Sequence, residues 1–188
     1  MAMGTRDALV QAAEILMRSK GYAAFSYADL VETVGIKKAS IHHHFPTKED
    51  LGTAIVEAYI DKVRADFERI ELVNEDLEGR LKAFFLAFSA SSEGGLLPLC
   101  GALAAEMAAL PLGLQRLTHR FFDIQLKWLT KIFDRGVANG EIPAISSNRQ
   151  KAFQLLSALE GASFVNWALK EGESLDWNFI RLVAGLND

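Results

Sequence analysis

The stretch SYADLVETVGIKKASIHHHFPTKEDL, from Ser26 to Leu51, decides the fold of the N-terminal part of the chain. Ser26 followed three residues later by Asp29 is typical of a capping box, in which a hydroxyl and a carboxylate bind the free amides of a helix start. Apolar residues at positions 30, 31 and 34 then predict one short helix with a buried stripe. Gly35 comes next and can adopt the left-handed conformation that ends a helix.

A second short helix is predicted directly after this turn. Ile41 and Phe45 lie four residues apart, so both face the same side of a helix. Pro46 ends that helix, because proline has no amide hydrogen to donate and restricts the residue before it. Thr47, with Asp50 three residues later, resembles the N-cap of a third helix. Two short helices around a tight turn form a helix-turn-helix.

The outer face of the second short helix is basic and rich in hydrogen-bonding side chains. No acidic residue occurs between Thr33 and Lys48, although acids outnumber bases over the whole chain. Such a face on an exposed helix suits the major groove of DNA, where phosphates and base edges are presented. The alternative is a solvated polar face on a small helical corner. The turn glycine, the cap pattern and the acid-free face together favour DNA binding.

The segment VGIKKASIHHHFPTKEDL resembles the DNA-binding segment of the TetR/AcrR family of transcriptional regulators. The family pattern is a helix, a glycine turn and a short helix ending in His-Phe before Lys-Glu-x-Leu, and the resemblance covers about residues 5 to 55. Val31 and His42 depart from it, since the family usually has alanine and tyrosine there. The resemblance implies a homodimeric repressor that binds an operator in double-stranded DNA and responds to a small-molecule effector.

This resemblance and the exposed face together predict the DNA-binding residues. Lys38, Ala39 and His43 match the reading positions of the family and are expected to contact base edges. The residues expected to contact phosphates are Ser26, Tyr27, Ser40, His42 and Lys48. The predicted set is Ser26, Tyr27, Lys37, Lys38, Ala39, Ser40, His42, His43 and Lys48.

Composition agrees with a globular DNA-binding protein. The chain has 188 residues, half of them hydrophobic, which is enough for one or two domains with a sizeable core. The net charge is −4, yet residues 1–50 hold six bases and six acids, so the negative charge lies in the remainder. Repulsion from that remainder helps to orient the N-terminal end toward DNA. We expect a cytoplasmic protein, because no apolar run approaches about 20 residues and no signal-peptide pattern is present.

The remaining pattern is helical throughout, and the predicted fold is all-α. We expect a DNA-binding domain at residues 1–50 and a helical ligand-binding and dimerisation domain at residues 51–188. In the resembling family the helix after Thr47 connects the two domains and transmits the signal. The expected helices are Thr5 to Lys20 with Thr5 as cap, two between Ser26 and Phe45, Thr47 to Ile70, Leu77 to Ser89, Leu97 to Leu110, Leu112 to Asn139, Asn148 to Lys170 and Leu175 to Leu186.

Aromatic residues spread over several C-terminal helices are candidates for an effector pocket, which the resemblance implies. Ligand cavities are mostly apolar with few polar groups, so we expect a small, largely apolar or aromatic effector. The alternative for each residue is ordinary core packing. The predicted lining is Phe84, Phe88, Met107, Phe121, Gln125, Trp128, Phe164 and Trp167.

A dimer interface is predicted on the segment LLSALEGASFVNWAL, from Leu155 to Leu169. Small side chains at helical spacing let two helices approach closely. Glycine inside a helix costs about 1 kcal/mol relative to alanine, so Gly161 itself indicates close packing. The resemblance implies a four-helix bundle formed across a two-fold axis by residues 148–170 and 175–186. The predicted contacts are Ser157, Ala158, Gly161 and Ala162.

The sequence also bears on oxidant sensing, metal binding and catalysis. Cys100, the single cysteine, excludes an internal disulfide framework, and it lies in LPLCGALAAEM, which resembles a branch of these regulators that senses oxidants. The surrounding leucines favour an inert buried thiol. The consecutive histidines 42–44 diverge by about 100° per residue, so they cannot share one metal ion. No nucleophile–base motif, metal-ligand spacing or phosphate-binding glycine loop indicates an enzyme or a cofactor.

Overall fold

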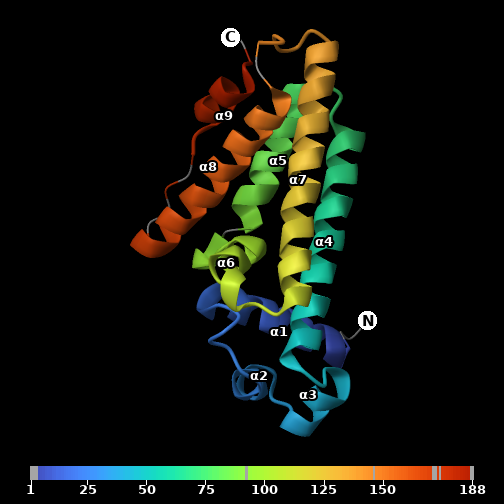
Figure 1. Cartoon of the computed structure of the whole chain (residues 1–188), viewed down its shortest axis with the longest axis vertical. Coiled ribbons are helices and arrows are strands. Elements are labelled where there is room, and N and C mark those ends of the chain that lie inside the picture. The colour runs from blue at the N-terminus through green and yellow to red at the C-terminus, as the bar shows by residue number, and fades with distance from the viewer. Residues whose placement is uncertain (1–3, 92, 146, 171–172, 174, 187–188) are drawn as a thin grey trace. The chain divides into compact units, whose positions relative to one another are not determined.

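The computed structural model describes residues 4–91, 93–145, 147–170, 173 and 175–186. Every regular element in these ranges is a helix, as Figure 1 shows, and the all-α prediction is confirmed. The elements are α1 (Thr5–Lys20), α2 (Tyr27–Val34), α3 (Lys38–His44), α4 (Lys48–Val73), α5 (Leu77–Ser91), η1 (Glu93–Gly95), α6 (Leu99–Ala105), η2 (Met107–Ala109), α7 (Leu112–Ala138), α8 (Asn148–Leu169) and α9 (Trp177–Ala184).

The chain forms two compact units. The first contains residues 1–61 and 96–121, and the second contains residues 62–95 and 122–188. The long helices α4 and α7 therefore contribute residues to both units. This division by compactness joins α6 to the N-terminal helices. The functional boundary expected after residue 50 stays a prediction, because compactness and function are different criteria.

The first unit is built on α1, which packs against α2 and α6. Its predicted apolar stripe, at residues 9, 12, 13 and 16, is buried. Leu30 of α2 and Ile41 of α3 are also completely buried. The periodicity that predicted these short helices thus corresponds to one core beneath the helix-turn-helix.

The second unit has a core contributed by five helices, α4, α5, α7, α8 and α9. Its centre is aromatic: the rings of Phe67 and Trp128 stack in parallel with centroids 4.2 Å apart. Phe84 lies against both of them, with ring centroids 6.1 and 5.6 Å away. The indole N–H of Trp128 donates to Glu71 at 2.9 Å, so the polar end of the buried ring has a partner.

Several helix ends differ from the expected ones. Gly4 is the N-cap of α1, so Thr5 is its first residue and does not cap it. The single helix expected from Leu97 to Leu110 is two pieces, α6 and η2, separated at Glu106. Pro98 precedes the first helical residue of α6, as its missing amide hydrogen allows. None of the helices described is long and apolar enough to cross a membrane.

Candidate functional site

The turn between α2 and α3 has the predicted helix-turn-helix geometry. The capping box is present, and Asp29 accepts from both the amide and the hydroxyl of Ser26, at 2.7 and 2.8 Å. The Lys20 ammonium, which donates to Asp29, and then Ser26 hold the pKa of this carboxyl below its ordinary value. Gly35 ends α2 with φ 74° and ψ 24°, the left-handed conformation that glycine adopts readily.

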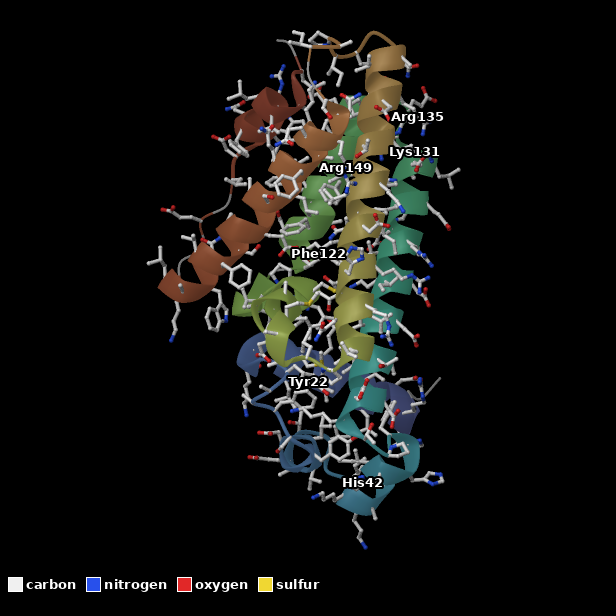
Figure 2. The ribbon with its side chains drawn as sticks, viewed as in Figure 1. Tyr22, His42, Phe122, Lys131, Arg135 and Arg149 are labelled. Carbon is white, nitrogen blue, oxygen red and sulfur yellow. The ribbon has the colours of Figure 1, made fainter. Side chains whose placement is uncertain are left out.

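Buried contacts fix the orientation of α3. Ile41 and Phe45 point into the core, and the Tyr27 hydroxyl donates to the Phe45 carbonyl at 2.9 Å. The guanidinium of Arg6 lies 5.3 Å from the centre of the Phe45 ring. Most of the opposite face is open to solvent. Figure 2 labels His42 on α3, where its ring centroid lies 4.9 Å from that of Tyr27. The exposed residues of the predicted DNA-binding set are Ser26, Lys37, Lys38, Ala39, His42 and His43, and Ser40 is half-buried.

Some residues predicted to contact phosphates are engaged within the protein. Burial raises the pKa of Tyr27 to about 12, and its hydroxyl already donates to a carbonyl. The Lys48 ammonium donates to the Ala23 carbonyl at 3.2 Å and lies 4.7 and 4.5 Å from the ring centres of Tyr22 and Phe25. Burial lowers the pKa of Lys48. Phosphate binding by Tyr27 or Lys48 stays a prediction, and it requires these hydrogen bonds to change.

Two polar contacts attach the α6 segment to α1 and to the α1–α2 loop inside the first unit. The Arg18 guanidinium donates through Nε to the Leu97 carbonyl at 2.8 Å. The Ala23 amide donates to the Glu106 carboxylate at 2.8 Å. Sequence reasoning missed these contacts, because their partners lie 79 and 83 residues apart in the chain. They hold α6 and the α1–α2 loop together as one piece.

The predicted effector residues are divided between the two units. Phe84, Phe88 and Trp128 pack together in the second unit, with Phe84 and Phe88 centroids 6.3 Å apart. Phe164 and Trp167 lie on α8 of the same unit. Met107 and Phe121 belong to the first unit, where Phe121 lies 5.4 Å from the Tyr59 ring. Their assignment to an effector pocket stays a prediction.

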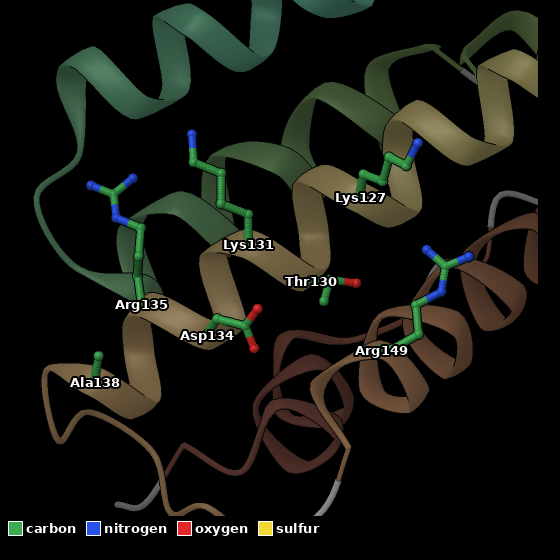
Figure 3. Close-up of a pocket in the computed structure, with 7 residues that line it drawn as sticks. All are labelled: Lys127, Thr130, Lys131, Asp134, Arg135, Ala138 and Arg149. Atoms are coloured by element: carbon green, nitrogen blue, oxygen red, sulfur yellow. The ribbon is translucent and has the colours of Figure 1, made fainter.

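A surface groove of about 470 Å³ lies elsewhere, between α7 and the first turn of α8 (Figure 3). It is lined by Lys127, Thr130, Lys131, Asp134, Arg135, Ala138 and Arg149. None of the predicted effector residues is among them. Glu71 pairs with both Lys131 and Arg135, and Asp123 pairs with Lys127. Three of the four cations in the lining thus have carboxylate partners, and Asp134 also lines the groove, so the groove offers little unbalanced charge to a ligand.

The predicted dimer face of α8 is open in the monomer. Ser157 and Gly161 are exposed, and Ala158 and Ala162 are half-buried. A Cβ atom at position 161 would have no heavy atom within 4 Å. Large apolar side chains on the same helix are uncovered as well: Phe153 is 54% exposed and Val165 is 56% exposed. An apolar face of this kind is typical of a surface that another molecule covers.

Comparison with known proteins identifies the helix-turn-helix. Residues 9–55 match the family model described as bacterial regulatory proteins, tetR family. The HTH-type transcriptional regulator CymR of Pseudomonas putida is 30% identical over 149 residues, which cover 74% of this chain and 71% of CymR. The chain belongs to the TetR family.

Other similar proteins match over most of the chain. The nucleoid occlusion factor SlmA of Aliivibrio fischeri strain MJ11 is 28% identical over 165 residues, or 84% of this chain and 81% of SlmA. A TetR-family transcriptional regulator from Agrobacterium tumefaciens superposes with a TM-score of 0.85 at 28% identity, covering 95% of this chain and 93% of that structure. The resemblance inferred from the residues around Gly35 is therefore confirmed, and the protein is a TetR-family transcriptional regulator.

Cys100 of this TetR-family protein is completely buried on α6. A thiol needs solvent access and a stabilised thiolate to react with oxidants, so its environment is that of an inert cysteine. Among the described residues, no three His, Cys, Asp or Glu side chains are arranged so that they could hold one metal ion.

Sequence reasoning overlooked Glu160 of the second unit, whose carboxyl group is buried. Both of its carboxylate oxygens are buried without a hydrogen-bond partner. Burial raises its pKa from an ordinary 4.5 to about 7. One signal in the sequence could have found it: Glu160 is the only charged residue between Lys151 and Lys170. Gln125, whose Nε2 is also buried without a partner, is only 3% exposed.

This carboxyl group predicts an unusual pH dependence of stability. The folded pKa is higher than the unfolded one, so the folded state binds the proton more tightly and loses stability as pH rises from about 4.5 to about 7. The full loss is about 3 kcal/mol and stays constant above that range. Glu160→Gln should remove this fall. Urea unfolding at fixed protein concentration between pH 5 and 8 measures the difference between the two proteins.

Glu78→Gln is the matched control, because Glu78 is exposed on α5. This variant should follow the wild type at every pH. A wild-type profile that runs parallel to that of Glu160→Gln would show that Glu160 is ionised at neutral pH without penalty.

Proposed function

We propose that this regulator is a dimeric repressor that leaves a near-palindromic operator when a small effector binds among its C-terminal helices. The observation that carries the DNA-binding part is the exposed face of α3, which has no acidic residue and is oriented by the buried Ile41 and Phe45. Its partners are then operator DNA, an effector and a second copy of the chain. The regulator acts in the cytoplasm and catalyses no reaction. Repressors among the TetR-family relatives support this proposal.

Lys38, Ala39 and His43 are proposed to read base edges. All three are exposed on α3, which begins at Lys38. Lys37 precedes the helix, is exposed as well, and is suited to hold a phosphate as a point charge. Base contacts specify a sequence, whereas phosphate contacts fix register and contribute affinity for every sequence.

Replacing His43 by alanine should therefore relax specificity, while Lys37→Ala should weaken all sequences alike. Removing one base contact costs about 1–3 kcal/mol of discrimination, and removing one phosphate contact reduces the salt slope by about 0.9. The operator is first located by footprinting on the gene's own upstream DNA. Fluorescence anisotropy against a set of single-base operator variants, at several salt concentrations, then separates the two effects.

Glu32→Gln serves as the control, because Glu32 is exposed on α2 and outside the predicted contact set. It should retain the specificity profile of the wild type. Identical base preferences for His43→Ala and Lys37→Ala would contradict the assignment of roles. Failure of the wild type to bind any upstream fragment would contradict the proposed function itself.

A second copy is proposed to cover the exposed face of α8. The face combines small residues around Gly161 with uncovered apolar side chains such as Phe153. An isologous dimer presents two identical heads, which fit major grooves about 34–36 Å apart on one side of the DNA. This symmetry is the reason to expect a near-palindromic operator.

The effector is proposed to be small and largely apolar or aromatic. The second unit has an aromatic core, and three of the four cations in its surface groove already have carboxylate partners. An effector shifts the protein between DNA-competent and released states only by its differential affinity for them. Moving the population from 1:99 to 99:1 requires about 5.5 kcal/mol. An oxidant acting on Cys100 is the other candidate signal, and its complete burial speaks against it.

A further inference from the structure

Glu160 lies in a stripe of aromatic residues along one side of α8. Phe153, Glu160, Phe164 and Trp167 follow each other at intervals of seven, four and three residues, which places them on one side of a helix. Leu156, one turn before Glu160, and Leu159, next to it in the sequence, belong to the apolar core of the second unit. The carboxyl group therefore lies on a mostly apolar, aromatic helix side, on which Ser157 is another polar residue.

The aromatic members of this stripe are not fully packed. Trp167 is 44% exposed and Phe164 is half-buried, so their rings keep surface that a ligand can cover. Phe153 is 54% exposed and belongs to the face that the second copy is proposed to cover. Two of them, Phe164 and Trp167, belong to the effector residues predicted from the sequence, and Glu160 lies one and two turns before them.

An unpartnered buried carboxyl group is costly and requires a physical explanation. Taking a carboxylate out of water without a partner costs several kcal/mol, so the group stays protonated instead. Departures of this kind from ordinary core composition concentrate at functional sites, because a bound ligand can offset the desolvation cost of the carboxylate. The ligand group that stabilises a carboxylate most is a cation that donates hydrogen bonds, and aromatic faces also attract cations.

We propose that Glu160 and the aromatic side of α8 bind an apolar effector through a basic nitrogen. The carboxylate accepts hydrogen bonds from the ammonium group, and the rings of Phe164 and Trp167 cover the apolar part. Gln125, on α7 of the same core, is a second buried polar group that has no protein partner for its Nε2. This inference rests on the proposed effector function and adds to it the chemical class of the effector.

The test uses sets of three probes that share one apolar skeleton and differ in charge. Benzylamine, 2-phenylethylamine, 1-naphthylmethylamine and diphenylmethylamine are each compared with the matching alcohol and the matching carboxylate. Calorimetry on the full-length protein measures binding at pH 7. At least one amine should bind about tenfold or more tightly than its alcohol, which corresponds to one charge-assisted hydrogen bond. Its carboxylate should bind more weakly still.

Proton linkage provides a readout that a structural role of Glu160 would not change. Glu160 has a pKa of about 7, so at pH 6 most molecules must release its proton before the carboxylate can pair with an ammonium. Amine affinity should therefore rise about tenfold from pH 6 to pH 8. Calorimetry in two buffers of different ionisation enthalpy should also show about one proton released at pH 6.

In Glu160→Gln, the binding affinity of the amine should fall to that of the alcohol and should no longer depend on pH. Amine binding to this variant should release no proton. Glu160→Leu, which suits the apolar surroundings, repeats the test if the glutamine variant folds poorly by circular dichroism. Glu78→Gln should match the wild type. The proposal is overturned if no amine is preferred over its alcohol in any set, or if the preference survives in both Glu160 variants.

DNA binding is measured separately on the operator, which distinguishes the two proposals. Release of DNA by neutral or acidic compounds alone would leave the repressor function intact and overturn the amine site. Selective amine binding that depends on Glu160 but does not alter operator affinity would support the site and contradict the effector function.

Discussion

Gly161→Leu should separate the dimer and weaken operator binding by about 100-fold or more. The structure makes this substitution harmless to the monomer, because a Cβ at position 161 points into open space and leucine favours a helix by about 1 kcal/mol over glycine. In the proposed dimer the same side chain would occupy the space of the partner helix. Losing the partner removes the second head, whose effective concentration on the same DNA is in the millimolar range.

Light scattering at micromolar concentration and anisotropy on the full operator measure the two effects. Ala58→Leu introduces the same side chain at an exposed position of α4 and should leave both unchanged. A half-operator should bind wild type and Gly161→Leu with similar affinity, since one head is sufficient for it. A Gly161→Leu variant that remains dimeric would contradict the proposed close packing of the two α8 helices at this residue.

Trp128→Ala should lower the free energy of unfolding by about 3–5 kcal/mol, the usual cost of removing a buried aromatic ring. Trp128 is 7% exposed, stacks on Phe67 and donates to Glu71. Glu71 keeps Lys131 and Arg135 as partners in the variant, so the cost comes from the packing of the missing ring. For a chain of this length the melting temperature should fall by about 10 °C or more.

Trp167→Ala is the matched control. The same substitution at a residue that is 44% exposed should cost less than about 1 kcal/mol. Thermal and urea unfolding followed by circular dichroism compare the two variants. Equal losses of stability would contradict the placement of Trp128 at the centre of the second unit. Because replacing Trp128 is expected to destabilise the fold, effector binding is better tested by replacing Phe164, another residue of the predicted effector set.

The sequence by itself determined the local structure of the reading head. A capping box at Ser26, a glycine at the left-handed position 35 and a proline after Phe45 act through bonds within a few residues, so their outcome does not depend on distant parts of the chain. The same holds for the helical periodicity that predicted the all-α fold. These local signals are also the ones that carried the family resemblance.

Only the tertiary structure decided which polar groups are engaged and which are isolated. Lys48 reads as a free cation in the sequence, but the fold places it against the Ala23 carbonyl and two aromatic rings. Glu106 interrupts an expected helix and binds a loop amide 83 residues away. Glu160 looks like an ordinary helical glutamate, yet burial on α8 leaves its oxygens without partners. Burial and partner distance depend on contacts between remote segments, and one sequence does not encode these in any local pattern.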